Sequence, residues 1–338
     1  MTASTGVGSR LVIDADRARG GPGRRGWYEV YYVTAALPGG RGAWLRWTLH
    51  APRSGDASTA LWAVAFDTSR PRWFAARNQL PGSAWRPLDQ GGVALGDAEV
   101  RPDGCRGEAV DTLGRTMRWE LRWSALAAPF PFFPAALERT ARAATYPIVA
   151  VPLGRADGYI DIDGARIDCA AVAVEQTHLF GGHHAHRWAW AHALGFDEDP
   201  DGWLAMVWAV PHRLGGRLPP VSSLGLRLHG RELRPHGVRG LRSVLWSDGG
   251  GDVARFSAML DDVSVEAELR IPGEQLAGVV YHDPDGSKVY CANTEVADCV
   301  LRLREPDGRA TTARCIAACG VERGSRQAAD GVWPALNS

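Results

Sequence analysis

The sequence has little lysine and no long apolar run, and the second of these shortages excludes a class of protein. Lys288 is the only lysine among 38 basic residues, a bias that we attribute to codon usage in a GC-rich genome. The 38 acidic residues bring the formal net charge to zero, so no basic stripe indicates a nucleic-acid partner. No stretch reaches the ~18 to 20 apolar residues of a membrane helix. Residues 1–25 also lack the apolar core of a secretory signal, so we expect a cytoplasmic protein without a transmembrane segment.

Cysteines and nucleotide-binding or hydrolase motifs are also scarce. The six cysteines form no C-x-x-C pair, and only Cys315 and Cys319 lie four apart, without a second pair at zinc-finger spacing. We expect them to be free, mostly buried thiols. The chain has no phosphate-cradling glycine loop, dinucleotide fingerprint, G-x-S-x-G elbow or H-E-x-x-H motif. These absences disfavour nucleotide-dependent enzymes, serine hydrolases and zinc proteases of the common types.

Alternating apolar and polar residues dominate the sequence that remains, together with 14 tryptophans. Period-two alternation bounded by turn residues is typical of antiparallel strands. It predicts strands at residues 27–34, 43–50, 60–66 and 116–123, and tight turns at residues 163–164, 284–286 and 306–308. One short helix, at residues 134–144, is the best helical candidate. The fold class is therefore all-β, as two antiparallel barrels or sandwiches with little helix.

The expected domain division rests on two segments that are rich in glycine, proline or arginine. Residues 1–25 are predicted to be a flexible tail. Residues 213–220, with the sequence RLGGRLPP, are the best candidate linker. These limits give an N-terminal β domain at residues 26–212 and a C-terminal β domain at residues 221–338.

Five of the ten histidines lie between His178 and His192, and they mark the candidate functional centre. Alternate residues of a strand share a face. If residues 182–192 form one strand, its large, titratable face carries His184, His186, Trp188, Trp190 and His192. Burying several imidazoles costs free energy unless partners are supplied, which favours a functional interpretation over a purely structural one. Gly181 and Gly182 would allow a sharp entry into this strand.

Three chemical roles remain open for this face. Imidazole titrates in the range that general acid–base catalysis needs, and the nearby Glu175 and His178 are further candidate catalytic groups. Two imidazoles at His184 and His186, about 7 Å apart on a strand, would also suit a divalent metal, but no third ligand is identifiable. The third role is a non-catalytic wall that binds a ligand through histidine hydrogen bonds and tryptophan packing. Of these roles, we predict acid–base catalysis by the histidines and no bound metal.

Polar residues on other aromatic strands are candidates to complete the same cavity. Arg46 shares a predicted strand face with Trp44, and Tyr31 shares one with Trp27. We include Trp44, Arg46 and Tyr31, with Trp188, Trp190 and His192, among the residues expected to bind a substrate.

The layout of these segments resembles the double-lipocalin group of AttH-like proteins, carotenoid 1,2-hydratases, tocopherol cyclases and lipocalin-like Diels–Alderases. The resemblance is carried by five segments: residues 27–32 (WYEVYY), 43–49 (AWLRWTL), 61–67 (LWAVAFD), 175–192 and 290–298 (YCANTEVAD). It implies two packed lipocalin-like barrels, a hydrophobic ligand and no organic cofactor. At residues 177–184 this chain reads THLFGGHH, where the hydratases and tocopherol cyclases carry an acidic or Asn-Trp-Gly signature. Their particular reactions are therefore not implied.

These observations lead to one expected function and its rivals. The first is a cofactor-independent isomerase or cyclase, including a pericyclase, that acts on a hydrophobic secondary metabolite with histidine acid–base assistance. A carrier for a lipid, pigment or antibiotic is the alternative without chemistry. The third alternative is a hydratase, a dehydratase or a metal-dependent lyase. The substrate and the oligomeric state are left open by the sequence.

Overall fold

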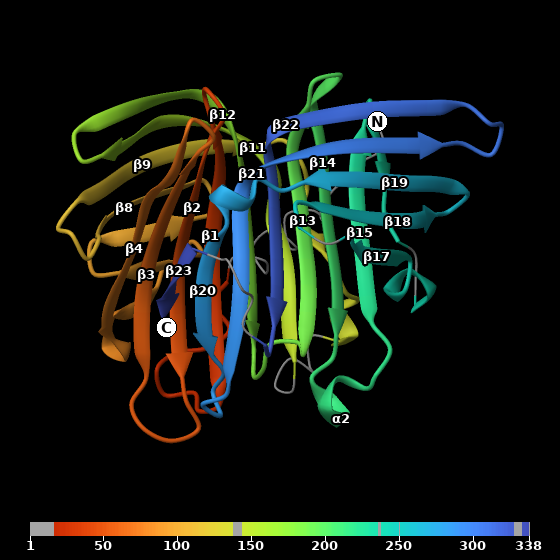
Figure 1. The fold of residues 1–338 in the computed structure, drawn as a ribbon. Coiled ribbons are helices and arrows are strands. Elements are labelled where there is room, and N and C mark those ends of the chain that lie inside the picture. The colour runs from red at the N-terminus through yellow and green to blue at the C-terminus, as the bar shows by residue number, and fades with distance from the viewer. Residues whose placement is uncertain (1–16, 138–143, 236–237, 250, 328–332, 338) are drawn as a thin grey trace, which may run out of the picture.

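The protein folds into two large antiparallel sheets, seen here in a computed structural model that describes residues 17–137, 144–235, 238–249, 251–327 and 333–337. Figure 1 shows the sheets side by side, with the N-terminal strands on one side and most of the C-terminal strands on the other. The predicted all-β class with little helix is confirmed. Among the described residues, no helix is long and apolar enough to cross a membrane.

Within the described residues the first sheet has 12 strands, in the order β4-β3-β2-β1-β12-β11-β9-β8-β7-β6-β5, with β10 paired to β11. The bounds are β1 (Trp27–Leu37), β2 (Arg41–Ala51), β3 (Ser58–Asp67), β4 (Arg70–Pro81), β5 (Trp85–Pro87), β6 (Val93–Leu95), β7 (Ala98–Arg101), β8 (Gly104–Val110), β9 (Thr116–Ala125), β10 (Phe130–Pro131), β11 (Thr145–Ile162) and β12 (Ala165–Gly181). Each of the four predicted strands lies inside one of these elements, because alternation reports the pleat directly.

The second sheet has 11 described strands, in the order β16-β15-β14-β13-β22-β21-β19-β18-β17, with β20 between β21 and β23. The bounds are β13 (Arg187–Phe196), β14 (Asp199–Val210), β15 (Val221–Leu228), β16 (Arg231–Leu233), β17 (Val244–Asp248), β18 (Val253–Leu260), β19 (Val263–Arg270), β20 (Ala277–His282), β21 (Lys288–Arg304), β22 (Ala310–Ser325) and β23 (Trp333–Asn337). The predicted turns at 163–164, 284–286 and 306–308 each join two consecutive strands.

Helical structure is confined to short turns in the described residues. They include η1 (Gly82–Ala84), α2 (Arg213–Gly216), η3 (Val238–Leu241) and η4 (Gly273–Gln275). Of the expected helix at 134–144, residues 135–137 form a 3-10 turn, and residues 138–143 lie outside the described residues.

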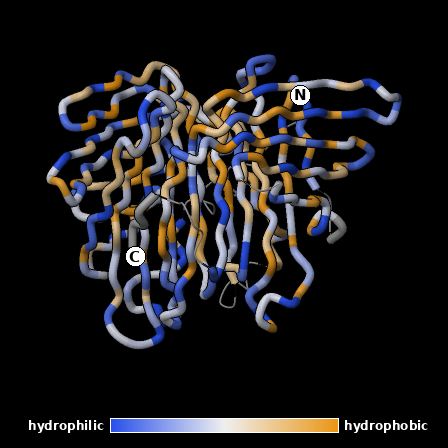
Figure 2. The backbone as a smooth tube through the Cα atoms, viewed as in Figure 1, coloured by the Kyte–Doolittle hydropathy of each residue, from blue (hydrophilic) through white to orange (hydrophobic). Residues whose placement is uncertain are grey.

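Three main hydrophobic cores hold the molecule together. One fills the interior of the first sheet, and a second fills the interior of the other sheet. The third lies between the sheets and takes aromatic residues from both: Tyr28, Tyr32, Trp44 and Trp62 from the first, and Trp190, Trp203 and Tyr281 from the second. Hydrophilic residues gather at many of the hairpin ends in Figure 2. The two units therefore share a continuous apolar layer, in which burial of large aromatic rings stabilises their association.

The change from one sheet to the other falls between Gly181 and Arg187. The segment expected as a linker, residues 213–220, instead contains α2 and connects β14 to β15, which are neighbours in the second sheet. Strands β13 and β14, placed by the prediction with the N-terminal domain, thus pair within the second sheet. The glycine and proline signal at 213–220 was a tight connection between antiparallel strands, which uses the same residue types as a linker.

The described end of the predicted tail is attached to the first sheet. The backbone N–H groups of Arg19 and Gly20 donate hydrogen bonds to the two carboxylate oxygens of Glu29 on β1. Arg24 lies over the ring of Trp27, with its guanidinium carbon 3.3 Å from the ring centroid. Residues 1–16 lie outside the described residues.

Candidate functional site

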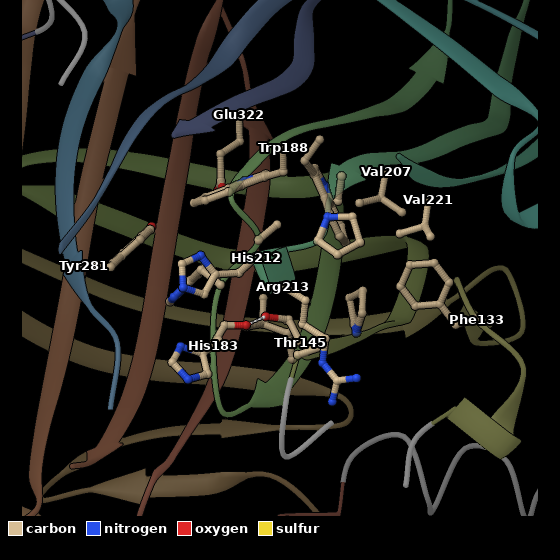
Figure 3. Close-up of a pocket in the computed structure, with 18 of the residues that line it drawn as sticks. Phe133, Thr145, His183, Trp188, Val207, His212, Arg213, Val221, Tyr281 and Glu322 are labelled. Atoms are coloured by element: carbon tan, nitrogen blue, oxygen red, sulfur yellow. Dashed lines mark hydrogen bonds between the residues drawn. The ribbon is translucent and has the colours of Figure 1, made fainter. Parts of the chain in front are cut away.

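A cavity of about 300 Å³ lies where the two sheets meet. Strands of the first sheet contribute Tyr32, Arg46 and Leu179 to its wall, and strands of the second contribute Trp190, Val207 and Tyr281. In Figure 3, Val207, Val221 and Phe133 lie together on one side, and Tyr281 lies on the opposite side. A concave, mainly apolar site with a few polar groups is typical of small-molecule binding.

His184 is the best-positioned titratable group in this cavity. It follows β12 in the short segment that crosses from one sheet to the other, and it lines the cavity. Its Nδ1 lies 2.7 Å from Oδ1 of Asp283, and its backbone N–H donates to the same oxygen over 2.9 Å. Because the carboxylate accepts, Nδ1 carries the hydrogen and Nε2 is left as the basic nitrogen of the neutral ring. Nε2 has no hydrogen-bond partner within the described chain.

Asp283 is held in its ionised form. Burial by itself would raise the pKa of this carboxyl, but the hydrogen bonds from the ring and backbone of His184 and the positive charge of Arg326 outweigh it, and the pKa is lowered well below its usual range. Nη2 of Arg326 donates to the second carboxylate oxygen and also to the backbone oxygen of His184, over 3.1 Å. Asp283 and Arg326 therefore fix both the ring and the backbone of His184, as an orienting carboxylate does for a catalytic histidine.

Aromatic rings fix the plane of the same imidazole. Tyr28 stacks on His184 with centroids 4.5 Å apart and planes within 3°, and Tyr281 stacks with centroids 5.2 Å apart and planes within 4°. The Tyr28 hydroxyl is hydrogen-bonded to the Thr145 hydroxyl, which donates to the backbone oxygen of His183 over 2.9 Å. A ring locked in this way loses little conformational freedom when a ligand binds.

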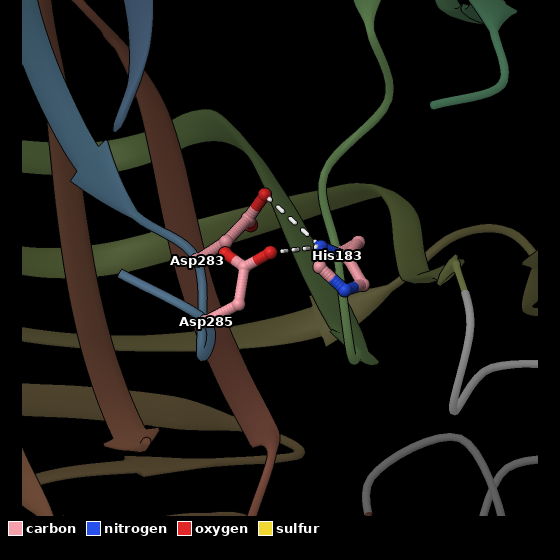
Figure 4. Close-up of side chains that lie close together, drawn as sticks. All are labelled: His183, Asp283 and Asp285. Carbon is pink, nitrogen blue, oxygen red and sulfur yellow. Dashed lines mark ion pairs between the residues drawn. The ribbon is translucent and has the colours of Figure 1, made fainter. Parts of the chain in front are cut away.

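His183, Asp283 and Asp285 form the described cluster that is closest to a metal site (Figure 4). Nδ1 of His183 lies 3.5 Å from Asp283 and 3.8 Å from Asp285, while its Nε2 lies 2.9 Å from Nη2 of Arg53. Arginine only donates, so Nε2 accepts and Nδ1 carries the hydrogen of the neutral ring. A protonated nitrogen does not bind a metal ion, and one carboxylate oxygen of Asp283 already accepts a hydrogen bond from Arg326. We interpret the cluster as an ion-pair network at the cavity edge.

The structure separates the predicted site residues into two groups. His184, Trp188, Trp190 and Arg46 line the cavity. The expected single strand over residues 182–192 begins only at Arg187, so His184 and His186 lie in the preceding loop and do not extend the strand face of Trp188. His186 packs beside His212 and Gly216 instead, and its backbone N–H donates to Val210 over 2.8 Å.

His178 and Tyr31 lie on the opposite face of their strands from the cavity. Nε2 of His178 is 3.0 Å from the Glu29 carboxylate, both side chains are fully buried, and Tyr31 stacks on the imidazole at 4.1 Å. Tyr31 belongs to the core inside the first sheet. Trp44 faces the inter-sheet core, where it packs on Trp62 outside the cavity lining.

Glu175 and His192 form a second buried cluster with Glu295. Nδ1 of His192 lies 3.7 Å from Glu175, and its Nε2 lies 3.1 Å from Glu295. Burial raises the pKa of Glu175 to about 7, against the opposing charge of His192. Burial would lower the pKa of His192, but the two carboxylates outweigh it and raise it to about 9. This cluster does not line the cavity, and it ties β12, β13 and β21 together across the sheet boundary.

Several residues that line the cavity or hold His184 beside it were not singled out from the sequence. Asp283 directly precedes the turn predicted at 284–286, and Tyr28 lies on the face of β1 opposite to the one chosen. Tyr281, Glu322 and Arg326 come from the last quarter of the chain and carried no motif. The Asp283 carboxylate, next to a turn after an aromatic strand end, was the one available signal.

Gly324 limits the position of Trp188 at the cavity wall. An added Cβ at Gly324 would lie 2.1 Å from the Trp188 ring, which is hydrogen-bonded through Nε1 to Glu322 over 2.6 Å. We expect Gly324→Ala to lower the free energy of unfolding by about 1–3 kcal/mol, because the ring must shift. Chemical denaturation measures this, with Gly21→Ala as control, since a Cβ there meets nothing within 4 Å. Equal stability of both variants would contradict the expectation.

Solved structures of known proteins resemble the chain in fold. No protein-family model matches the chain. Its fold matches CghA, with a TM-score of 0.56, 12% identity and coverage of 91% of this chain and 93% of that one, and also the complex of CghA with Sch210972, with a TM-score of 0.55. A putative AttH protein, NE1406 from Nitrosomonas europaea, matches with a TM-score of 0.52 and 12% identity over 88% of this chain and 92% of that one. The predicted double-lipocalin fold is thereby confirmed.

Sequence comparison gives a nearer relationship. The uncharacterized proteins Rv0493c and MT0513, from two strains of Mycobacterium tuberculosis, are each 30% identical to this chain over 322 residues, covering 88% of both proteins. Identity at this level along nearly the whole length of both chains shows common descent. The chain belongs to the family of Mycobacterium tuberculosis Rv0493c.

Proposed function

We propose that the protein is a cofactor-independent isomerase or cyclase that acts on a hydrophobic small molecule in the cavity between the two sheets. The observation that carries the proposal is the hydrogen bond from His184 to Asp283, which presents Nε2 as a base inside an aromatic cavity. An imidazole oriented by a fully buried carboxylate is a costly arrangement for a site that only stores a ligand. The match to CghA, solved with Sch210972, supports a small-molecule ligand for this fold.

The chemistry assigned to the chain is proton transfer and substrate folding. Nε2 of His184 would remove a proton from the bound molecule, and the imidazolium so formed, stabilised by ionised Asp283, would return it at another position. The apolar wall, including Trp188, Trp190 and Val207, would hold the reacting ends together. Orienting two reacting groups supplies up to about 7–11 kcal/mol of a barrier, so a ring closure needs little more than shape and one proton shuttle.

A carrier function is the second candidate. The cavity wall would bind an apolar molecule equally well without any proton transfer. The pairing of His184 with Asp283 is what favours an enzyme. A hydratase or dehydratase would use the same proton shuttle with water as a reactant, and the product decides between these reactions.

Deleting the gene in its host and comparing apolar extracts by high-resolution mass spectrometry tests the proposal. We expect the mutant to accumulate a compound with the same elemental formula as the product that it lacks. A formula difference of one water would replace the isomerase by a hydratase or dehydratase. A change only in the amount or location of existing compounds would support the carrier and contradict the enzyme.

A further inference from the structure

Arg46 is a buried cation whose donors are only partly used by the protein. The residue is 4% exposed, lies on β2 and lines the cavity. Its Nε donates to the Thr48 hydroxyl over 3.1 Å, and its Nη1 donates to the Tyr281 hydroxyl over 2.7 Å. A guanidinium carries five N–H donors. In the described chain, three of these have no acceptor.

The charge of Arg46 is also uncompensated. No carboxylate of the described residues forms an ion pair with it, although buried charges in proteins are normally paired. The rings of Tyr281 and Trp44 lie 4.3 and 5.5 Å from the guanidinium carbon and stabilise the charge by roughly 0.5–2 kcal/mol. That is small beside the cost of burying a cation, so a further partner is missing from the protein itself.

Among the described residues, Glu322 is the acidic group in the cavity lining, and it forms no ion pair with Arg46. Oε1 of Glu322 accepts the Nε1–H of Trp188 over 2.6 Å, and the carboxylate also interacts with the thiol of Cys291. The buried Nε1 of Trp190 in the cavity lining also has no hydrogen-bond partner among the described residues. The cavity thus combines apolar walls with unused N–H donors and a buried cation, Arg46, that has no ion-pair partner among the described residues.

We propose that Arg46 binds an ionised oxygen group, a carboxylate or an enolate, on the hydrophobic ligand. Guanidinium groups suit such oxygens because two parallel N–H bonds can meet them. The inference rests on the proposed function, since it concerns the same cavity, and it narrows the ligand to an apolar molecule with one acidic oxygen. An enolate held at Arg46 would keep its negative charge while His184 moves a proton elsewhere on the molecule.

A pair of fluorescent probes with one ring system tests this without knowledge of the ligand. The anion 8-anilinonaphthalene-1-sulfonate and the neutral N-phenyl-1-naphthylamine differ by the sulfonate alone. Each probe is titrated into the wild type and the variants. Ala209 lines the cavity, so Ala209→Trp fills it, and only the binding that this substitution abolishes is assigned to the cavity. We expect Arg46→Met to weaken the anionic probe about tenfold and to change the neutral probe less than twofold.

Two arginine variants sharpen the result. Arg213 is a second cation in the cavity lining but is exposed, so we expect Arg213→Met to weaken the anionic probe less than Arg46→Met does and to leave the neutral probe unchanged. Arg46→Lys keeps the charge and should retain part of the affinity for the anion. This variant also takes the place of Arg46→Met in the test if Arg46→Met does not fold. Equal weakening of both probes by substitution of Arg46, or loss of anion binding in Arg213→Met instead, would overturn the assignment to Arg46. If the wild-type cavity binds neither probe, both the proposed hydrophobic site and the proposed role of Arg46 are contradicted.

Discussion

Replacing His184 by Gln is expected to slow product formation by about 10²- to 10⁴-fold, the usual contribution of a general acid–base group. Glutamine keeps much of the side-chain volume but has no titratable nitrogen at the position of Nε2. The measurement uses the compound that accumulates in the deletion strain, incubated with purified protein, and follows product by mass spectrometry. His186→Gln is the matched control, because His186 belongs to the same loop but does not line the cavity.

Asp283→Asn separates the role of the carboxylate from that of the ring. An amide at this position can no longer hold the Nδ1–H tautomer through an ionised acceptor, and it removes the charge that stabilises the imidazolium. We expect a loss smaller than that of His184→Gln, with the fold intact by circular dichroism. Full activity in His184→Gln would refute acid–base catalysis and leave substrate folding as the whole function. An equal loss of activity in His186→Gln would show that disturbance of the loop, and not the loss of the His184 imidazole, causes the effect.

Raising the pH from 6.5 to 8.5 is expected to destabilise the protein through the buried cluster of His192, Glu175 and Glu295. The pKa of His192 is about 9 in the folded chain and near 6.5 in the unfolded one. Its stabilising contribution is therefore complete below pH 6.5 and is lost as the pH rises through 9. Glu175, with a pKa raised to about 7, also binds its proton more tightly when folded, so it acts in the same direction from pH 4.5 to 7.

At about 1.4 kcal/mol per pKa unit, the full shift of His192 corresponds to on the order of 3 kcal/mol, of which roughly 2 kcal/mol is lost between pH 6.5 and 8.5. Thermal or chemical denaturation across this pH window measures it. The matched variant is Glu175→Gln combined with Glu295→Gln, which removes the two charges that raise the pKa of His192. Burial then lowers that pKa, and stability should no longer fall between pH 6.5 and 8.5. An unchanged pH dependence in the double variant would show that other groups cause it.

Strand alternation made much of the fold predictable, and its failures have local causes. The aromatic strands and the Asp-Gly turns were predicted because the pleat and the turn each impose a residue pattern within a few positions. The linker at 213–220 was wrong as a boundary between sheets, because a connection within one sheet uses the same glycines and prolines. The continuous strand at 182–192 was wrong because β12 ends at Gly181 and the chain crosses to the second sheet before β13 begins at Arg187.

The sequence by itself determined the class of the protein: an all-β chain of double-lipocalin type, with a histidine- and tryptophan-rich segment near its middle and Arg46 on an aromatic strand. Only the tertiary structure decided which of these residues meet. Alternation assigns residues to one of two faces but does not tell which face points to a cavity, so Tyr28 and Tyr31 were indistinguishable until the sheets were placed. The pairing of His184 with Asp283 joins positions 99 residues apart, and contacts at such separation arise from topology, which no local pattern encodes.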